Sequence, residues 1–391
     1  MTKEERVLRQ FTKEEVDYLP SEITFSDRTR DKEISKAVGL ASPDELDDYL
    51  ENHIYWTLTK HDAPLFSRND EKVLGELQEE GYCRMDLDRG IVFDSWGIGI
   101  EMHSDGFFVR SHPLQPEEAG GENKEYLRKM LPSDFNTEIL DMNLEDAIKN
   151  YTCPDIDRKG NFDTMEKDMK ERSGEIMVVP SGYFGIYERA YSIMGFEEFM
   201  MELALRPKMV EILLDKITDY KVEVAKRKVR MGAKVGHHGD DLGAQTTTLM
   251  SGKMFREMIK PRMDSVFKVY RDAGLPIILH SCGHITDIIP DLIEIGLTGL
   301  HPVQPSMDLN YLKKEFGKDL VFWGGIDTQD KLPYGTPEEV KKLAKDTIRT
   351  LGIGGGHIIA PAQEVMNDVP IDNIKALVET IIEERQKVLS L

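Results

Sequence analysis

The chain has 391 residues, with 50 Lys and Arg against 71 Asp and Glu, which gives a formal net charge of −21. Such an acidic chain lacks the basic footprint that nucleic acids and anionic membranes require, so we expect neither as a partner. Hydrophobic residues make up 40% of the chain, with 31 Gly and 18 Pro, as in a globular protein. No apolar run approaches the roughly 18 residues of a membrane span.

Three widely spaced cysteines, an odd number, do not suit a disulfide framework and favour a reducing compartment. The start of the chain is charged and has no apolar segment of the kind found in a secretion signal. We therefore expect a cytoplasmic protein.

The first part of the chain, residues 1–85, is predicted to be a helical extension. It is charge-rich with helical periodicity, and no strong strand is expected before Gly81. Short β-type runs begin at Gly90 and Phe107 and are separated by Asp105-Gly106, a hairpin signal that predicts a β-ribbon. Residues 115–172 are polar and predict long loops and surface helices.

From Glu175 onward, short apolar runs alternate with amphipathic stretches, which predicts repeated β-α units. We interpret residues 86–391 as an α/β domain, a (β/α)8 TIM barrel, ahead of an open doubly wound sheet. Helices are predicted at 186–206, 207–231, 254–273, 285–295, 337–351 and 371–389. The predicted strands are 176–179, 233–236, 276–279, 299–303, 320–323 and 357–360.

Polar residues cluster directly after these strands, where a barrel places its active site. The residues expected to converge there are Tyr183, Tyr187, Glu188, His237, His238, Asp240, Asp241, His280, Cys282, Gln304, Asp327, Gln363 and Glu364.

The sharpest local signal is His280-Ser-Cys-Gly at the end of a strand. Residues two apart in an extended segment point the same way, so His280 and Cys282 could bind one ion, and imidazole with thiolate suits zinc. The alternative is a packed thiol beside a structural histidine. Asp241 could be a base, a hydrogen-bond acceptor or a group supporting a metal ligand; a helix cap or salt bridge is equally consistent.

Other candidates are weighed against ordinary structural roles. Glu188 begins a helix, where the helix dipole favours a carboxylate regardless of function. His237 and His238 diverge on an extended segment, so a shared metal is not expected. The glycine run from Gly352 precedes a strand and opens no helix, so it fails as a dinucleotide loop.

Taken together, several strings resemble the uroporphyrinogen decarboxylase superfamily: Gly239-Asp-Asp-Leu-Gly-Ala-Gln, His280-Ser-Cys-Gly, Trp323-Gly-Gly-Ile-Asp, and Ala360-Pro-Ala-Gln followed by Val369-Pro. The resemblance covers about residue 92 to the C-terminus. It implies a (β/α)8 barrel, often dimeric, with the active site at its mouth. The superfamily divides into porphyrinogen decarboxylases and methyltransferases that serve corrinoid proteins.

The resemblance favours the methyltransferase branch. The Arg-Gln-Ala-Gly-Arg segment of the decarboxylases is absent, and the corresponding region starts at Tyr18. His280 and Cys282 match two zinc ligands of the methyltransferases. The family's third ligand, a cysteine, is replaced here by Gln363. Candidate oxygen ligands are Glu188, the first choice, with Glu364, Gln363 and Asp241 as alternatives.

Oxygen ligands leave zinc a stronger Lewis acid than a second thiolate does, which suits ether cleavage. The expected function is therefore transfer of a methyl group from an O-methylated, aromatic donor to a corrinoid protein. Asp241, Glu188 and Gln304 are the expected catalytic residues. Substrate is expected to contact Tyr183, Phe184, Tyr187, His238 and Gln363, with Trp96 as a further aromatic wall.

The chain has no D-x-H-x-x-G cobalamin-ligand pattern, so the corrinoid (cobalamin) is expected on a separate protein. A homodimer is implied by the resemblance only. Three alternatives stay open: methyl transfer from the corrinoid to a thiol, a metal-free lyase of the decarboxylase type, and a barrel that only binds a ligand.

Overall fold

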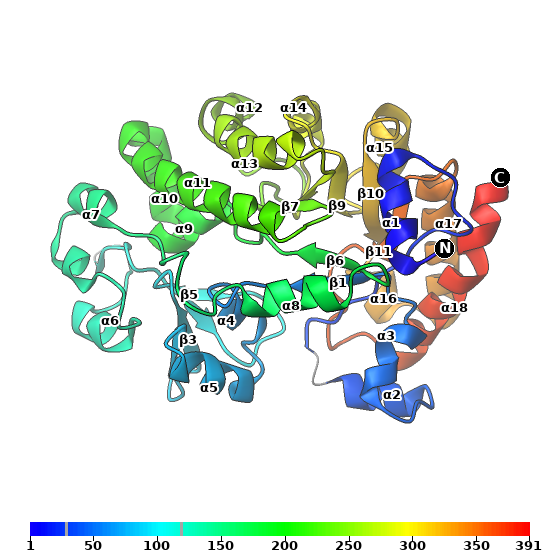
Figure 1. The fold of residues 1–391 in the computed structure, drawn as a ribbon, viewed down its shortest axis with the longest axis horizontal. Coiled ribbons are helices and arrows are strands. Elements are labelled where there is room, and N and C mark those ends of the chain that lie inside the picture. Colours follow the sequence, from blue (N-terminus) through cyan, green and yellow to red (C-terminus); the bar gives the residue numbers. More distant parts are fainter. Residues whose placement is uncertain (28–29, 118–119) are drawn as a thin grey trace.

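The computed structural model describes residues 1–27, 30–117 and 120–391, and its centre is a set of parallel strands (Figure 1). Strand β1 (Ile54–Thr57) pairs with β6 (Met177–Pro180). A five-stranded parallel sheet has the order β11-β10-β9-β8-β7. Its members are β7 (Gly236–Gly239), β8 (Ile277–His280), β9 (Gly299–Val303), β10 (Val321–Ile326) and β11 (His357–Pro361).

Backbone hydrogen bonds join the two sheets into a closed ring. The N–H of Gly239, at the end of β7, donates to the carbonyl of Gly182, just after β6, at 2.9 Å. Residues 20–23 lie between β11 and β1: the Glu22 N–H donates to Ile359 O at 2.9 Å, and the His53 N–H donates to Ser21 O at 3.0 Å. Two strands, five strands and this segment make eight members, which confirms the predicted (β/α)8 barrel.

Every residue of β6, β7, β8, β10 and β11 is buried, as expected for parallel strands that helices cover on the outside. None of the helices in the described ranges is both long and apolar enough to cross a membrane. The helices that follow the strands are α9 (Tyr187–Met194), α10 (Phe196–Leu205), α11 (Pro207–Arg230), α12 (Gly252–Met254), α13 (Lys260–Asp272), α14 (Ile289–Glu294), α15 (Leu309–Phe316), α16 (Lys331–Tyr334), α17 (Pro337–Gly352) and α18 (Ile371–Lys387).

Helix α1 (Lys3–Thr12) closes the amino end of the barrel. Its Val7 belongs to the apolar cluster formed by strand residues such as Ile278 and Ile358. Just before β11, the Gly356 N–H donates to Gln10 Oε1 at 2.9 Å. Because α1 occupies this end, the carboxyl ends of the strands are left to form the site.

The connection between β1 and β6 carries an antiparallel sheet that lies beside the barrel (Figure 1). The predicted β-ribbon is part of this sheet, and Asp105-Gly106 lies in the β4–β5 connection as predicted. The sheet comprises β2 (Cys83–Asp86), β3 (Ile91–Asp94), β4 (Gly99–Glu101) and β5 (Val109–Ser111), and the helices of this connection are α4 (Ala63–Phe66), α5 (Glu71–Glu79), α6 (Lys124–Met130), α7 (Leu144–Asn150) and α8 (Asp163–Glu171).

Three expectations about local structure are wrong. Residues 1–81 contain the barrel strand β1, in which Ile54 and Thr57 are buried, as well as helices α2 (Asp31–Ala37) and α3 (Leu46–Tyr49). The single helix expected over 186–206 is divided at Gly195, whose φ of 84° is left-handed. The strand expected at 233–236 lies at 236–239. A domain boundary at residue 85 stays a prediction.

Candidate metal centre and its cavity

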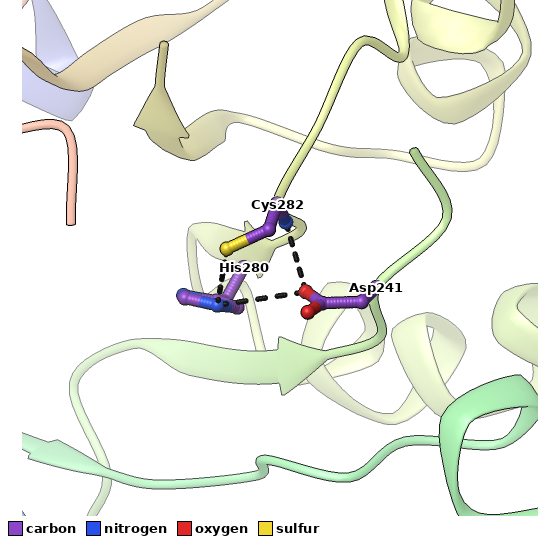
Figure 2. Close-up of side chains that lie close together, drawn as sticks. All are labelled: Asp241, His280 and Cys282. Carbon is purple, nitrogen blue, oxygen red and sulfur yellow. Dashed lines mark hydrogen bonds and ion pairs between the residues drawn. The ribbon is translucent and has the colours of Figure 1, made fainter. Parts of the chain in front are cut away.

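Three side chains with different donor atoms meet at the carboxyl end of the barrel (Figure 2): those of Asp241, His280 and Cys282. Their potential ligand atoms all lie within 4.8 Å of one another. His280 Nε2 is 3.6 Å from Cys282 Sγ and 3.6 Å from Asp241 Oδ1. We call these three residues the trio.

The local sequence explains how the trio forms. His280 ends β8 and Cys282 follows two residues later, while Asp241 lies two residues beyond the end of β7. The Cys282 N–H donates to Asp241 Oδ1 at 2.8 Å, which joins the two loops. A Cβ on Gly283, whose φ is 84°, would lie 2.3 Å from the backbone of Gly243. Only glycines allow the loops to approach this closely.

The trio fits a zinc ion by its chemistry and by its spacing. Carboxylate oxygen, imidazole nitrogen and thiolate sulfur are the three protein ligand types of zinc. With zinc–ligand bonds of about 2.0–2.3 Å, tetrahedral geometry separates neighbouring ligand atoms by about 3.4–3.6 Å. The two distances of 3.6 Å around His280 Nε2 match this spacing.

The electrostatics of the trio depend on burial. Burial lowers the pKa of His280, so the imidazole is neutral and can coordinate a metal. Its other nitrogen, Nδ1, lies 3.0 Å from Nδ1 of His301. Burial, followed by the charge of Asp241, raises the pKa of Cys282 well above its usual value. A cation at the trio would oppose this effect and favour the thiolate.

The trio lies in the wall of a cavity of about 690 Å³ that is rich in aromatic side chains and carboxyl groups. Five residues predicted for the site besides the trio also line it: Tyr183, Phe184, Glu188, Gln363 and Glu364. The amide of Gln363 donates to Cys282 Sγ at 3.6 Å. Glu188 is 9% exposed, and burial, followed by the charge of Asp241, raises its pKa well above the usual value.

Three residues expected in the site lie outside the cavity lining. Tyr187 is fully buried, with its hydroxyl 3.2 Å from Met200 Sδ. His238 is part of β7 and is 1% exposed, because that strand begins three residues later than expected. Gln304 accepts from the Gly283 N–H at 2.7 Å, so it braces the loop that carries Cys282. Their proposed roles remain predictions.

Other candidates have structural positions. Trp96 is fully buried against Tyr220, with ring centroids 4.8 Å apart. His237 accepts from the Gly182 N–H at 2.9 Å. The carboxylate of Asp240 accepts three N–H groups, those of Ile186, Tyr187 and Glu188, at the start of α9. Asp327 accepts three others, from residues 329 to 331.

Several cavity residues were missed because they lie in the part assigned to a helical extension or in the β-ribbon. Their only sequence signal is the apolar run Ile54-Tyr-Trp-Thr, which becomes β1. Trp56 contacts Tyr183, with ring centroids 5.6 Å apart, and stacks on Trp323 at 5.4 Å. The missed cavity residues in these parts include Glu22, Trp56, Phe66, Arg68 and Phe107; His301 was missed as well, although it lies in the predicted strand 299–303.

Two further glutamates, Glu22 and Glu364, line the cavity. Burial raises the pKa of Glu22 to about 8 and that of Glu364 to about 7. Arg68, the one Arg or Lys among the described residues of the lining, is 2% exposed and donates to backbone carbonyls of residues 65, 104 and 105. Its guanidinium lies 4.0 Å from the centre of the Phe107 ring.

Known proteins with related sequences include methyltransferases. The chain is 25% identical over 186 residues to the methylated-thiol–coenzyme M methyltransferase of Methanosarcina mazei, covering 48% of each chain. It is 26% identical over 212 residues to a methylcobamide:CoM methyltransferase, MtaA, of Methanosarcina barkeri, covering 54% of this chain and 60% of the relative. The chain thus spans about half to three fifths of these relatives.

One solved structure, a methyltransferase from Methanosarcina mazei, has the same fold with a TM-score of 0.60 and 21% identity, covering 98% of this chain and 99% of that one. Residues 166–384, more than half of the chain, match the family described as Uroporphyrinogen decarboxylase (URO-D). The match contains the strands β6 to β11 and all three members of the trio. The chain therefore belongs to the uroporphyrinogen decarboxylase (URO-D) family.

Proposed function

We propose that this protein is a zinc-dependent methyltransferase that moves a methyl group from an O-methylated aromatic donor to a corrinoid protein. The observation that carries the proposal is the trio of Asp241, His280 and Cys282 in the wall of an aromatic cavity. The methyltransferase names of two relatives support the reaction class. The aromatic donor is supported by the cavity lining.

The donor atoms of the trio favour a Lewis-acid role. A single thiolate, an imidazole and a carboxylate donate less charge to a metal than two thiolates do. When bound, zinc would polarise the ether oxygen and lower the cost of releasing a phenolate. We propose Asp241 as the oxygen ligand, because it is the carboxylate next to His280 and Cys282. Glu188, the first choice from the sequence, receives a different role.

The residues of the chain itself would hold the donor and supply a proton. Trp56, Tyr183 and Phe184 form aromatic walls against which the ring of the donor packs. A reduced corrinoid, cobalt(I), would supply the electron pair that accepts the methyl group, and the electron pair of the broken bond between oxygen and methyl carbon would stay on the phenolate oxygen. Burial, followed by the charge of Asp241, raises the pKa of Glu188 and so disfavours its charged form, and we propose that it carries a proton. It would give that proton to the released phenolate oxygen.

The corrinoid would reach the methyl group from a partner protein. Helix α1 closes the amino end of the barrel, so the approach is to the carboxyl end. A homodimer and a cytoplasmic location, both expected from the sequence, remain part of the proposal.

The test begins with the metal. Elemental analysis of the purified protein should find about one zinc per chain, and His280→Ala and Cys282→Ser should each lose it. Cys153→Ser is the matched control, because Cys153 Sγ donates to Lys216 O at 3.6 Å, outside the cavity lining. Methoxyarenes are then supplied with a reduced corrinoid protein, and methylation of the cobalt is followed by absorbance. Zinc-independent transfer would refute the proposal.

A second candidate is methyl transfer from the corrinoid protein to a small thiol, which the coenzyme M names of both relatives favour. Consumption of a thiol such as 2-mercaptoethanesulfonate, with no reaction of methoxyarenes, would support it. An anionic acceptor of this kind is disfavoured because Arg68, the one Arg or Lys among the described lining residues, already donates to backbone carbonyls. Decarboxylation of an acidic tetrapyrrole is disfavoured similarly, because Arg68 already donates to backbone carbonyls.

A further inference from the structure

The cavity has a second polar end, and its position follows from the order of the strands. Around the ring, the sequence of members is residues 20–23, β1, β6, β7, β8, β9, β10 and β11. Residues 20–23 are therefore four positions from β8 in either direction. Glu22 lies on this segment and lines the cavity. It thus faces the trio from the opposite side of the barrel.

Glu22 is buried and held in place by a hydrogen bond from an indole. It is 3% exposed, and its Oε1 accepts a hydrogen bond from the indole N–H of Trp56 at 2.6 Å. Within residues 1–27, 30–117 and 120–391, no Lys, Arg or His forms an ion pair with this carboxyl. A buried carboxyl without a countercharge is more stable in its protonated form, which can donate a hydrogen bond.

The titratable groups that face Glu22 strengthen this conclusion. Asp47, in α3, and Glu364, after β11, both act on Glu22 as negative charges. Tyr183, after β6, interacts electrostatically with Glu22 from a third side. Trp56 and Trp323 are uncharged; their indole N–H groups act on Glu22 as hydrogen-bond donors, which favours the ionised carboxylate, but burial is the larger effect. None of these neighbours favours the ionised form by a positive charge, and burial raises the pKa of Glu22 to about 8.

We infer that Glu22 binds the substrate at the end remote from the trio, as an uncharged carboxyl that donates a hydrogen bond to a neutral oxygen on the aromatic ring. This rests on the proposed function, since it assumes that the methoxy group lies at the trio. The substrate class is then a methoxyarene with a second oxygen substituent opposite the first. The proton would lie on Oε2, because Oε1 accepts from Trp56.

The experiment compares three ligands by calorimetry with the full-length protein: methoxybenzene, 1,4-dimethoxybenzene and the (4-methoxyphenyl)trimethylammonium cation. At pH 6.5 the dimethoxy compound should bind about tenfold more tightly than methoxybenzene, as one hydrogen bond to a buried group allows. At pH 9 this preference should largely vanish, because Glu22 then loses its proton.

Variants of Glu22 test whether the preference for the dimethoxy compound depends on a hydrogen bond from residue 22, on its charge or on its shape. Glu22→Gln keeps a neutral donor, so the preference should persist at both pH values. Glu22→Ala should abolish it at both. Glu4→Gln is the matched control, because Glu4 is also buried in the N-terminal part but pairs with Lys234 outside the cavity. It should behave as the wild type. The pH dependence of the wild type alone tests the inference if Glu22→Ala does not fold.

Three outcomes would overturn the inference. A preference that survives in Glu22→Ala would show that another group binds the second oxygen. Tighter binding of the cation above pH 8, lost in Glu22→Gln, would make Glu22 a countercharge. Binding of neither neutral arene to the wild type would refute the aromatic donor itself, so failure of the proposed function is distinguished from failure of the role of Glu22.

Discussion

Replacing Glu22 by Gln should stabilise the protein at alkaline pH, independently of any substrate. The carboxyl is 3% exposed and Gln has nearly the same shape. Gln carries no charge, so it avoids the cost of ionising a group in the barrel interior. The amide can still accept the hydrogen bond that the indole of Trp56 donates to Oε1.

The magnitude follows from the pKa. Burial raises the pKa of Glu22 from 4.5 to about 8. Each unit of pKa difference corresponds to about 1.4 kcal/mol, so the unfolding free energy can change by at most about 5 kcal/mol. Between these two pKa values the folded state binds more protons at Glu22 than the unfolded state, so stability falls as pH rises. From pH 5 to pH 8 the wild type should lose about 3 kcal/mol relative to Glu22→Gln.

Urea unfolding at pH 5, 6, 7 and 8 measures this difference, because titrating groups that do not interact with Glu22 contribute equally to both proteins. Glu4→Gln should lower stability, since it removes the partner of Lys234. A free-energy difference between wild type and Glu22→Gln that stays constant from pH 5 to pH 8 would refute the reasoning. It would mean that Glu22 ionises in the folded protein as readily as in water.

Three further predictions concern the loops of the site. Asp241→Asn should weaken zinc binding about 10–100-fold, measured by competition with a chelator; unchanged affinity would exclude Asp241 from the metal. Gly283→Ala should lower both the melting temperature and the zinc content, because its Cβ would lie 2.3 Å from the backbone of Gly243. Asp240→Ala should lower the unfolding free energy by about 2–4 kcal/mol in urea, because three N–H groups lose their acceptor; a smaller loss would indicate that water replaces it.

Much of the barrel could be predicted because its strands are short apolar runs followed by amphipathic helices. The boundaries of the predicted runs at 276–279 and 357–360 lie within one residue of those of β8 and β11. The strand β1 was missed because four residues in a charge-rich region carry little periodic signal. The segment 20–23 is shorter still and is recognised only by its bonds to β1 and β11.

The sequence by itself determined the barrel architecture and the pair His280 and Cys282, because strand periodicity and the spacing of two residues on one strand end are local properties. Only the tertiary structure decided that Asp241 completes the trio and that Glu22 faces it. These residues come from ring members far apart in the chain, and the order in which strands pair determines which of them meet. Burial, which keeps the proton on Glu22, likewise exists only once the ring has closed.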